Sequence, residues 1–80
     1  MADIKVKLNE VLEEISVSPN KFAVESKIRS NTIYDLVNNK TKMITWKTLV
    51  AIIDTLNRIA EENNETRKFT VNDIIEYYED

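Results

Sequence analysis

Two helix boundaries in the middle of this chain constrain its fold most, because together they define a pair of short consecutive helices. Ser18 precedes Pro19. A serine oxygen can accept an orphan backbone amide at an N-cap, and proline is tolerated in the first helical turn, so a helix is predicted to begin at Pro19. A second helix is predicted to begin near Ser30. Asn38 and Asn39 should end it, since asparagine tolerates the left-handed conformation at a helix C-terminus.

The second of these helices is predicted to have one buried and one exposed face. Ile33, Leu36 and Val37 recur at helical spacing and form its apolar stripe. The other face carries small polar and aromatic groups, namely Ser30, Asn31, Tyr34, Asp35 and Asn38. The sequence therefore predicts a helix that presents hydrogen-bonding groups to the outside.

The chain before this pair is predicted to hold a short extended segment and one helix. Ile4 and Val6 alternate with polar residues, as in a strand, and helical spacing then runs from about Leu8 to Ile15. After the pair, Thr45 is the predicted N-cap of the longest helix, which runs from Trp46 to about Glu62.

The last part of the chain is predicted to become ordered again at Phe69. Thr70 and Asp73 have the spacing of a capping box, and Ile74, Ile75 and Tyr78 are expected to return to the core. Residues 76–79 form either a helix or a strand. We favour a strand paired with residues 4–6, because apolar residues at a period of two need a partner edge.

The composition excludes several classes of protein. Eighty residues suggest one domain, and the absence of cysteine and histidine rules out a disulfide scaffold, a zinc finger and a thiol or imidazole nucleophile. The chain also has no glycine that could cradle a phosphate, so we expect neither an enzyme nor a bound cofactor. Neither a signal segment nor a long apolar run is evident, which predicts a cytoplasmic protein without membrane contact.

The net charge of −3 is divided unevenly along the chain. Between residues 21 and 47 six basic residues stand against two acidic ones, which gives +4, whereas residues 59–80 have two basic and seven acidic residues, which gives −5. The molecule is therefore predicted to have a positive face that suits DNA and an acidic C-terminal end that points away or meets a partner.

A known family has the same spacing of residues. Phe22-Ala23, Lys27-Ile28, Ile33, Leu36 and Asn38-Asn39-Lys40 together resemble the helix-turn-helix of Cro and lambda-repressor-like transcriptional regulators. Residues 4–12, 44–56 and 73–77 are similar to other parts of its short members, so the resemblance covers nearly the whole chain. It implies a mainly α, compact lambda-repressor-like DNA-binding domain of four to five helices, with or without one short β pair between the termini. The single domain would span residues 1–80, with the helix-turn-helix at residues 19–39.

Two residues depart from the family pattern. Lys27 stands where glycine is usual, and a lysine held at positive φ would cost roughly 1 kcal/mol. Pro19 stands where many relatives have a glutamine that contacts DNA phosphate, so that contact is not expected here.

The resemblance also implies a set of DNA contacts. The family reads bases from the exposed turns of its second motif helix, which here are Ser30, Asn31, Tyr34 and Asp35. Contacts to the DNA backbone would come from Lys27, Arg29, Asn38, Lys40 and Lys42. The alternative is that the first set is a solvated helix face, that the cations are ordinary surface residues, and that Asn38 only caps its own helix.

Three aromatic residues have two interpretations each. Trp46 either lies against the DNA strand or, as we favour, packs in the core. Tyr77 and Tyr78 either contribute to a dimer contact or, as we favour for Tyr78, close the core. No exposed apolar seam that would predict a dimer interface is evident in the sequence.

The primary functional hypothesis is a sequence-specific regulator of transcription that binds double-stranded DNA, and more narrowly a small phage or bacterial repressor. We expect a homodimer on a two-fold operator, because one such unit offers little contact surface. The alternative is a protein-interaction module, as in an antirepressor or antitoxin. It would use the same scaffold to bind another regulator through its acidic C-terminal end or the surface around Tyr34.

Overall fold

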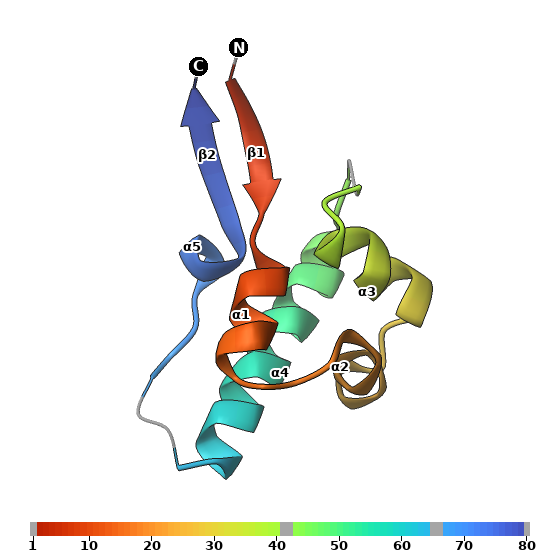
Figure 1. Ribbon diagram of the computed structural model, residues 1–80, viewed down its shortest axis with the longest axis vertical. Coiled ribbons are helices and arrows are strands. Elements are labelled where there is room, and N and C mark those ends of the chain that lie inside the picture. Colours follow the sequence, from red (N-terminus) through yellow and green to blue (C-terminus); the bar gives the residue numbers. More distant parts are fainter. Residues whose placement is uncertain (1, 41–42, 65–66, 80) are drawn as a thin grey trace.

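Within the residues that the structure describes, five helices form the body of the protein, and a two-stranded ribbon projects from it (Figure 1). The computed structural model describes residues 2–40, 43–64 and 67–79. Along the chain the elements are β1 (Ala2–Val6), α1 (Leu8–Glu14), α2 (Pro19–Ser26), α3 (Ser30–Val37), α4 (Trp46–Glu62), α5 (Val71–Ile74) and β2 (Ile75–Glu79). Helices α2 and α3 lie on one side of α1 and α4, and α5 with β2 lies on the other (Figure 1). The mainly helical fold with a β pair is therefore as predicted.

The predicted helix starts at residues 19 and 46 are confirmed by their caps. The Ser18 hydroxyl accepts the backbone N–H of Lys21 at 3.1 Å, and the Thr45 hydroxyl accepts that of Thr48 at 3.1 Å. Each cap satisfies an amide that the first helical turn leaves without a partner. These local bonds fix where α2 and α4 begin, and the second of them also fixes where the connection after α3 ends.

One apolar core joins all five helices. Helix α4 contributes a stripe in which Ile52 and Leu56 are fully buried, and Phe22, Leu8 and Ile33 reach it from other helices. Burying side chains of this size stabilises the folded state by about 1.5–3 kcal/mol each before the loss of chain entropy is counted. The core therefore fixes α2 and α3 against the rest of the body.

The strands at the two ends of the chain pair with each other, as the sequence analysis favoured. They are antiparallel, with Ile4 opposite Tyr77 and Val6 opposite Ile75. The helix that precedes β2 begins at the predicted capping box, in which the Asp73 carboxylate accepts the Thr70 backbone N–H at 2.9 Å. A further bond, from the Lys7 N–H to the Ile74 carbonyl at 2.6 Å, ties the base of the ribbon to α5.

The C-terminal segment is held to the body by polar side chains. The Asn57 amide both donates to and accepts from the backbone of Phe69, at 3.1 and 2.7 Å. Arg67 forms ion pairs with Glu14 of α1 and with Asp73, and its guanidinium lies 4.5 Å from the centre of the Phe69 ring. These contacts connect residues 67–73 to both α1 and α4.

The same contacts shift two pKa values. The pKa of the Asp73 carboxyl is lowered, first because the Thr70 N–H donates to its charged form and then because Arg67 lies beside it. The pKa of the Arg67 guanidinium is raised by its hydrogen bond to Glu14 and, to a smaller extent, by Asp73. Both shifts favour the charged forms, so the ion pairs persist at neutral pH.

Four helices end at residues with left-handed backbone conformations, and none of these residues is glycine. Ser16, Lys27, Asn39 and Asn64 have φ angles of 57°, 61°, 59° and 58°. At the ends of α2 and α3 the amides that follow bond back to carbonyls of the last turn, as in the Schellman motif. The left-handed conformations considered at Lys27 and Asn39 are thus confirmed, whereas Asn38 has a φ of −87° and is not left-handed.

Two aromatic residues that were expected in the core are exposed. Trp46 is 81% exposed, so the prediction that it packs in the core is wrong. It begins α4, and the neighbouring elements do not cover its side chain. Tyr78 is 42% exposed, because the chain turns from helix to strand at Ile75 and the alternation of a strand points Tyr78 away from the core. Among the described helices, none is long and apolar enough to cross a membrane.

Candidate nucleic-acid interface

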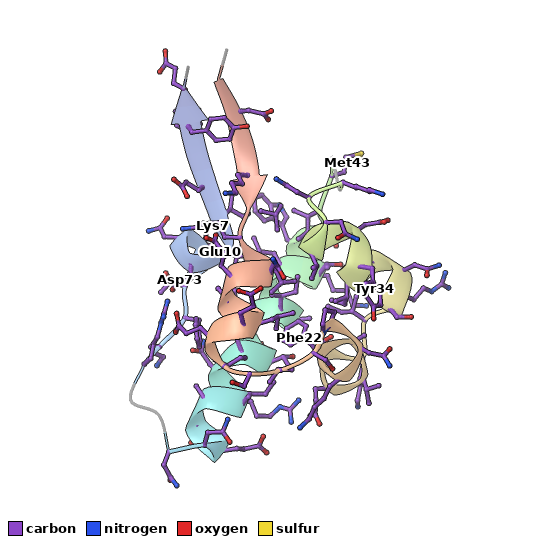
Figure 2. All side chains as sticks on the ribbon, in the orientation of Figure 1. Lys7, Glu10, Phe22, Tyr34, Met43 and Asp73 are labelled. Carbon is purple, nitrogen blue, oxygen red and sulfur yellow. The ribbon has the colours of Figure 1, made fainter. Side chains whose placement is uncertain are left out.

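Helix α3 is anchored by its apolar side and presents its polar side outward. Ile33 and Leu36 are almost completely buried, with exposed fractions of 0% and 1%. The four residues predicted to read bases all lie on the exposed side: Ser30, Asn31, Tyr34 and Asp35. Figure 2 shows the Tyr34 side chain on the outside of α3, away from α1 and α4. The structure therefore brings the predicted base-reading residues together on one accessible face.

The turn between α2 and α3 places two cations beside the beginning of α3. Lys27 takes the left-handed conformation, and the next amide, that of Ile28, donates to the Ala23 carbonyl at 3.2 Å. Arg29 is the residue before the helix, and its side chain makes no capping bond. Both Lys27 and Arg29 are exposed. They therefore flank the N-terminal end of α3, where its backbone amides also favour a phosphate.

The other end of α3 is fixed by backbone and side-chain bonds. The Lys40 N–H donates to the Asp35 carbonyl at 2.8 Å, and Asn39 holds the left-handed position between them. The Asn39 side-chain oxygen accepts the Val6 N–H of β1 at 3.2 Å, a contact that sequence reasoning missed. Asn38 and Lys40 are exposed beside this end. The predicted contact from Lys42 lies outside the described residues.

A contact between Arg58 of α4 and Glu25 of α2 helps to orient the helix-turn-helix. The Arg58 guanidinium of α4 donates to the Glu25 carbonyl at 2.8 Å and to its carboxylate at 3.2 Å. Half-exposed ion pairs contribute little energy, about 0–1 kcal/mol, so this contact orients α2 more than it stabilises the fold. It also neutralises Glu25, one of the two acidic residues between positions 21 and 47.

The charge pairing differs between the two sides of the molecule. The ion pairs of the described residues involve Lys7, Arg58 and Arg67. Within the same part of the chain, Lys27, Arg29 and Lys40 form no ion pair. The cations around α3 therefore remain available to phosphates, whereas the described acidic residues that form ion pairs are Glu14 of α1, Asp73 of α5, Glu76 of β2 and Glu25 of α2.

Apolar side chains are exposed in a place that the sequence did not reveal. Ile4 and Tyr77 of the ribbon are 57% and 65% exposed, and Met43 is 86% exposed. They line a groove of about 890 Å³ between the ribbon and the segment that follows α3. The sequence had shown no exposed apolar seam, and whether this groove is a dimer interface stays untested. The signal was present as alternating residues in two terminal strands, but their pairing was needed to see it.

Comparison with known proteins agrees with this geometry. A family model described as a Cro/C1-type HTH DNA-binding domain matches residues 7–61, which comprise α1 to most of α4 and leave out both strands. No curated protein and no solved structure matched the chain.

Proposed function

The chain belongs to the Cro/C1-type helix-turn-helix family of DNA-binding domains, and from this premise we propose that it is a sequence-specific repressor that reads the major groove with α3. The family supports DNA binding and regulation of transcription. The observation that carries the more specific proposal is the exposed polar face of α3, which is held outward by the buried Ile33 and Leu36.

The major groove is wide enough for one helix, and its base edges form an unambiguous pattern of donors and acceptors. Asn31 has the amide that can pair with adenine through two hydrogen bonds. Asp35 can accept from the cytosine amino group, Ser30 can bond to a base or a phosphate, and Tyr34 can contact a thymine methyl group. These four roles define the proposed reading surface.

The proposed backbone contacts come from both ends of α3. Lys27 and Arg29 would bind phosphates near its N-terminal end, while Asn38, Lys40 and Lys42 would bind them beyond its C-terminal end. Such contacts set the position of the protein on the duplex without selecting a sequence. Two copies on a two-fold operator, with half-sites about one helical turn apart, would give the contact surface that one copy lacks.

The test begins with duplexes selected from a random pool by the pure protein. Fluorescence anisotropy then compares the selected duplex with a scrambled one for the wild type, Asn31→Ala and the control Asn72→Ala. Asn72 is an exposed asparagine on α5, on the other side of the body from α3 (Figure 1). Asn31→Ala should weaken binding to the selected duplex by about 5- to 150-fold, the loss of one bidentate base contact, with little change on the scrambled duplex.

Two results would contradict the proposal. One is an unchanged preference for the selected duplex in Asn31→Ala, and the other is an equal loss in Asn72→Ala. The phosphate contacts are tested separately by salt. Lys27→Ala should make the slope of log K against log salt shallower by about 0.9, since one counterion fewer is released.

The second candidate function is a protein-interaction module that binds another regulator. The charge of −5 on residues 59–80 favours this function, because an acidic segment is repelled by the phosphates of DNA. Retention on heparin at low salt separates the two candidates. A DNA-binding repressor should be retained through the cations around α3, whereas a module that binds only protein should elute without retention. A repressor of this kind would act in the cytoplasm of a bacterial cell or a phage-infected host. A reporter gene placed behind the selected operator would measure its repression there.

A further inference from the structure

The single tryptophan of the chain lies in the open. Tryptophan is highly buried in most folded proteins, because its ring removes a large apolar area from water. Trp46 instead has an exposed fraction of 81%, and Val50, one turn further along α4, is 55% exposed. Residues four apart lie on the same side of a helix, so these two side chains form one apolar patch at the beginning of α4. Such a patch on a small domain indicates contact with another molecule.

The patch follows the reading helix directly, both in the chain and in space. Ile44, two residues before Trp46, lines the same groove as Leu36 of α3. Figure 1 shows the beginning of α4 beside α3, while the other end of α4 lies away from it. The Thr45 hydroxyl accepts the Thr48 N–H at 3.1 Å and donates to the Thr48 hydroxyl at 2.9 Å. The backbone of Trp46 is therefore held in a fixed position next to the surface proposed to face DNA.

The charges of this stretch of the chain are all positive. Residues 36–53 contain three lysines and no acidic residue. Two of these lysines, Lys40 and Lys47, are exposed, and neither forms an ion pair with another residue that the structure describes. A surface that combines apolar side chains with cations alone is complementary to a polyanion that also has apolar parts.

One strand of duplex DNA has this combination of groups, because its backbone alternates deoxyribose rings with phosphates. Contacts to sugar and phosphate make up at least half of the hydrogen bonds between proteins and DNA. The indole of Trp46 offers a flat apolar ring and one N–H donor. Its ring can pack on a sugar while its N–H donates to a phosphate oxygen, and Lys47 can pair with a neighbouring phosphate.

We propose that Trp46 packs against the sugar-phosphate strand of the duplex beside the C-terminal end of α3, with Lys47 on an adjacent phosphate. The inference rests on the proposed function in that it requires duplex DNA along α3. It adds an apolar contact outside the reading surface. Because this contact is made with the DNA backbone, it adds affinity for every sequence and selects none.

The absence of charge on the indole has a consequence for salt dependence. Each phosphate that a lysine neutralises releases counterions, and salt weakens that part of the affinity. Packing of Trp46 on a sugar releases none. The patch therefore gives a chain of net charge −3 a part of its DNA affinity that salt does not remove.

Tryptophan fluorescence of the full chain tests the proposal directly, since Trp46 is the only tryptophan. Acrylamide should quench the emission of the free protein strongly, because the ring is 81% exposed. Saturation with the selected duplex should lower the quenching constant by about threefold or more, because the ring becomes part of a buried interface. An unchanged quenching constant in the complex would overturn the proposal and would leave the patch to a protein partner.

Fluorescence anisotropy of variants separates the apolar contact from a charged one. Trp46→Ala should weaken binding to the selected and the scrambled duplex by the same factor of about ten, since it removes part of the burial of one large apolar side chain. Its slope of log K against log salt should equal that of the wild type, whereas Lys47→Ala should make the slope shallower by about 0.9. Trp46→Phe keeps an aromatic ring and should recover most of the affinity.

The control variant is Val71→Ala. Val71 is 45% exposed on α5, on the other side of the body from α3 (Figure 1), so this variant should bind both duplexes as the wild type does. Circular dichroism checks that all variants keep the helical content of the wild type. Unchanged binding of both duplexes by Trp46→Ala would overturn the proposal. A loss on the selected duplex alone would also overturn it, because it would make Trp46 a base-reading residue.

The same measurements distinguish a failure of this inference from a failure of the reading role of α3. A complex in which Asn31→Ala removes sequence preference but Trp46 stays open to acrylamide would refute the inference and retain the reading role. Protection of Trp46 on every duplex, with no preference for any sequence, would do the reverse. A chain that binds neither duplex would refute both.

Discussion

The paired hydrogen bonds between Asn57 and Phe69 lead to a sharp prediction about stability. The Asn57 amide donates to the Phe69 carbonyl at 3.1 Å and accepts the Phe69 N–H at 2.7 Å. Asn57 is half-buried, and Phe69 is 2% exposed. The perturbation is Asn57→Ala, which leaves the N–H and the carbonyl of Phe69 without these hydrogen bonds at a position that water reaches poorly.

The expected loss follows from these two bonds. A typical intramolecular hydrogen bond contributes about 1 kcal/mol net, and an unsatisfied buried group costs about 1–3 kcal/mol. Half-burial lets water replace part of the loss, so we expect the free energy of unfolding to fall by about 2 kcal/mol. A chain of 80 residues has about 4–12 kcal/mol in total, so the loss is a large share.

Urea denaturation followed by circular dichroism measures this loss. With a slope of about 1 kcal/mol per molar urea, the midpoint should fall by about 2 M. Asn9→Ala is the matched control, because Asn9 is exposed on α1, and its midpoint should stay close to that of the wild type. A shift of less than about 0.5 M for Asn57→Ala would refute the reasoning.

The charged variant Asn57→Asp separates the two bonds. Its carboxylate can still accept the Phe69 N–H, but it faces the Phe69 carbonyl without a proton to donate. The pKa of this carboxyl should therefore be raised in the folded state. Its penalty relative to the wild type should be present at pH 7 and should diminish as the pH falls through that raised value, where the protonated group donates again. A penalty independent of pH would show that the donated bond contributes nothing.

Three further predictions concern the core, the acid response and the link between ribbon and reading helix. Leu56→Ala should lower the free energy of unfolding by about 2–5 kcal/mol in urea, since Leu56 is fully buried and leaves a cavity. The pKa of Asp73 is lowered in the folded state, so its contribution is present at neutral pH and is lost as the pH falls through that depressed value. When the pH is lowered from 7 to below about 4, the melting temperature of Asp73→Asn should therefore fall less than that of the wild type. An equal fall in both proteins would contradict the lowered pKa. Both Asn39→Gly and Asn39→Ala lose the bond to Val6, but only glycine adopts the left-handed backbone without a steric cost. The alanine variant should therefore be less stable than the glycine variant by about 1 kcal/mol in urea. Equal stability of the two variants would show that the left-handed conformation has no cost there.

Local chemistry explains why most elements could be predicted from the sequence. Ser18 with Pro19, and Thr45 before Trp46, satisfy the first turn of their own helices, and the capping box at Thr70 does the same. The apolar stripe of α3 likewise needs only helical spacing to define its buried side. Each of these signals lies within a few residues of its effect.

The wrong predictions for two aromatic residues arise where local spacing was not enough. Trp46 lies three residues before the buried Leu49 and so has the spacing of the core face, but none of the elements that the structure describes covers the first turn of α4 on that side. Tyr78 has the spacing of a helix that begins before Ile74. The helix ends at Ile74, and from Ile75 the period changes to two, which reverses the direction of Tyr78.

The strand pairing between the two ends of the chain was favoured from the sequence, but the side-chain contacts between distant segments were not predicted. Asn57 with Phe69, Arg67 with Glu14 and Asn39 with Val6 are polar pairs, and an exposed polar residue looks the same in the sequence whether or not it has a partner. The groove required the register of the two strands for the same reason. The sequence was thus enough to propose the reading surface, whereas the groove beside the ribbon became visible only with the pairing of β1 and β2.

The left-handed ends of the helices have a consequence for the unfolded chain as well as for the folded one. Glycine would relieve the cost at Ser16, Lys27, Asn39 and Asn64, but it would also give the denatured chain many more conformations to occupy. A sequence with no glycine and only one proline keeps its backbone entropy uniform along its length. Strain in the native state is therefore partly offset by a less disordered unfolded chain, and each replacement by glycine would gain less than the relief of strain at its own position.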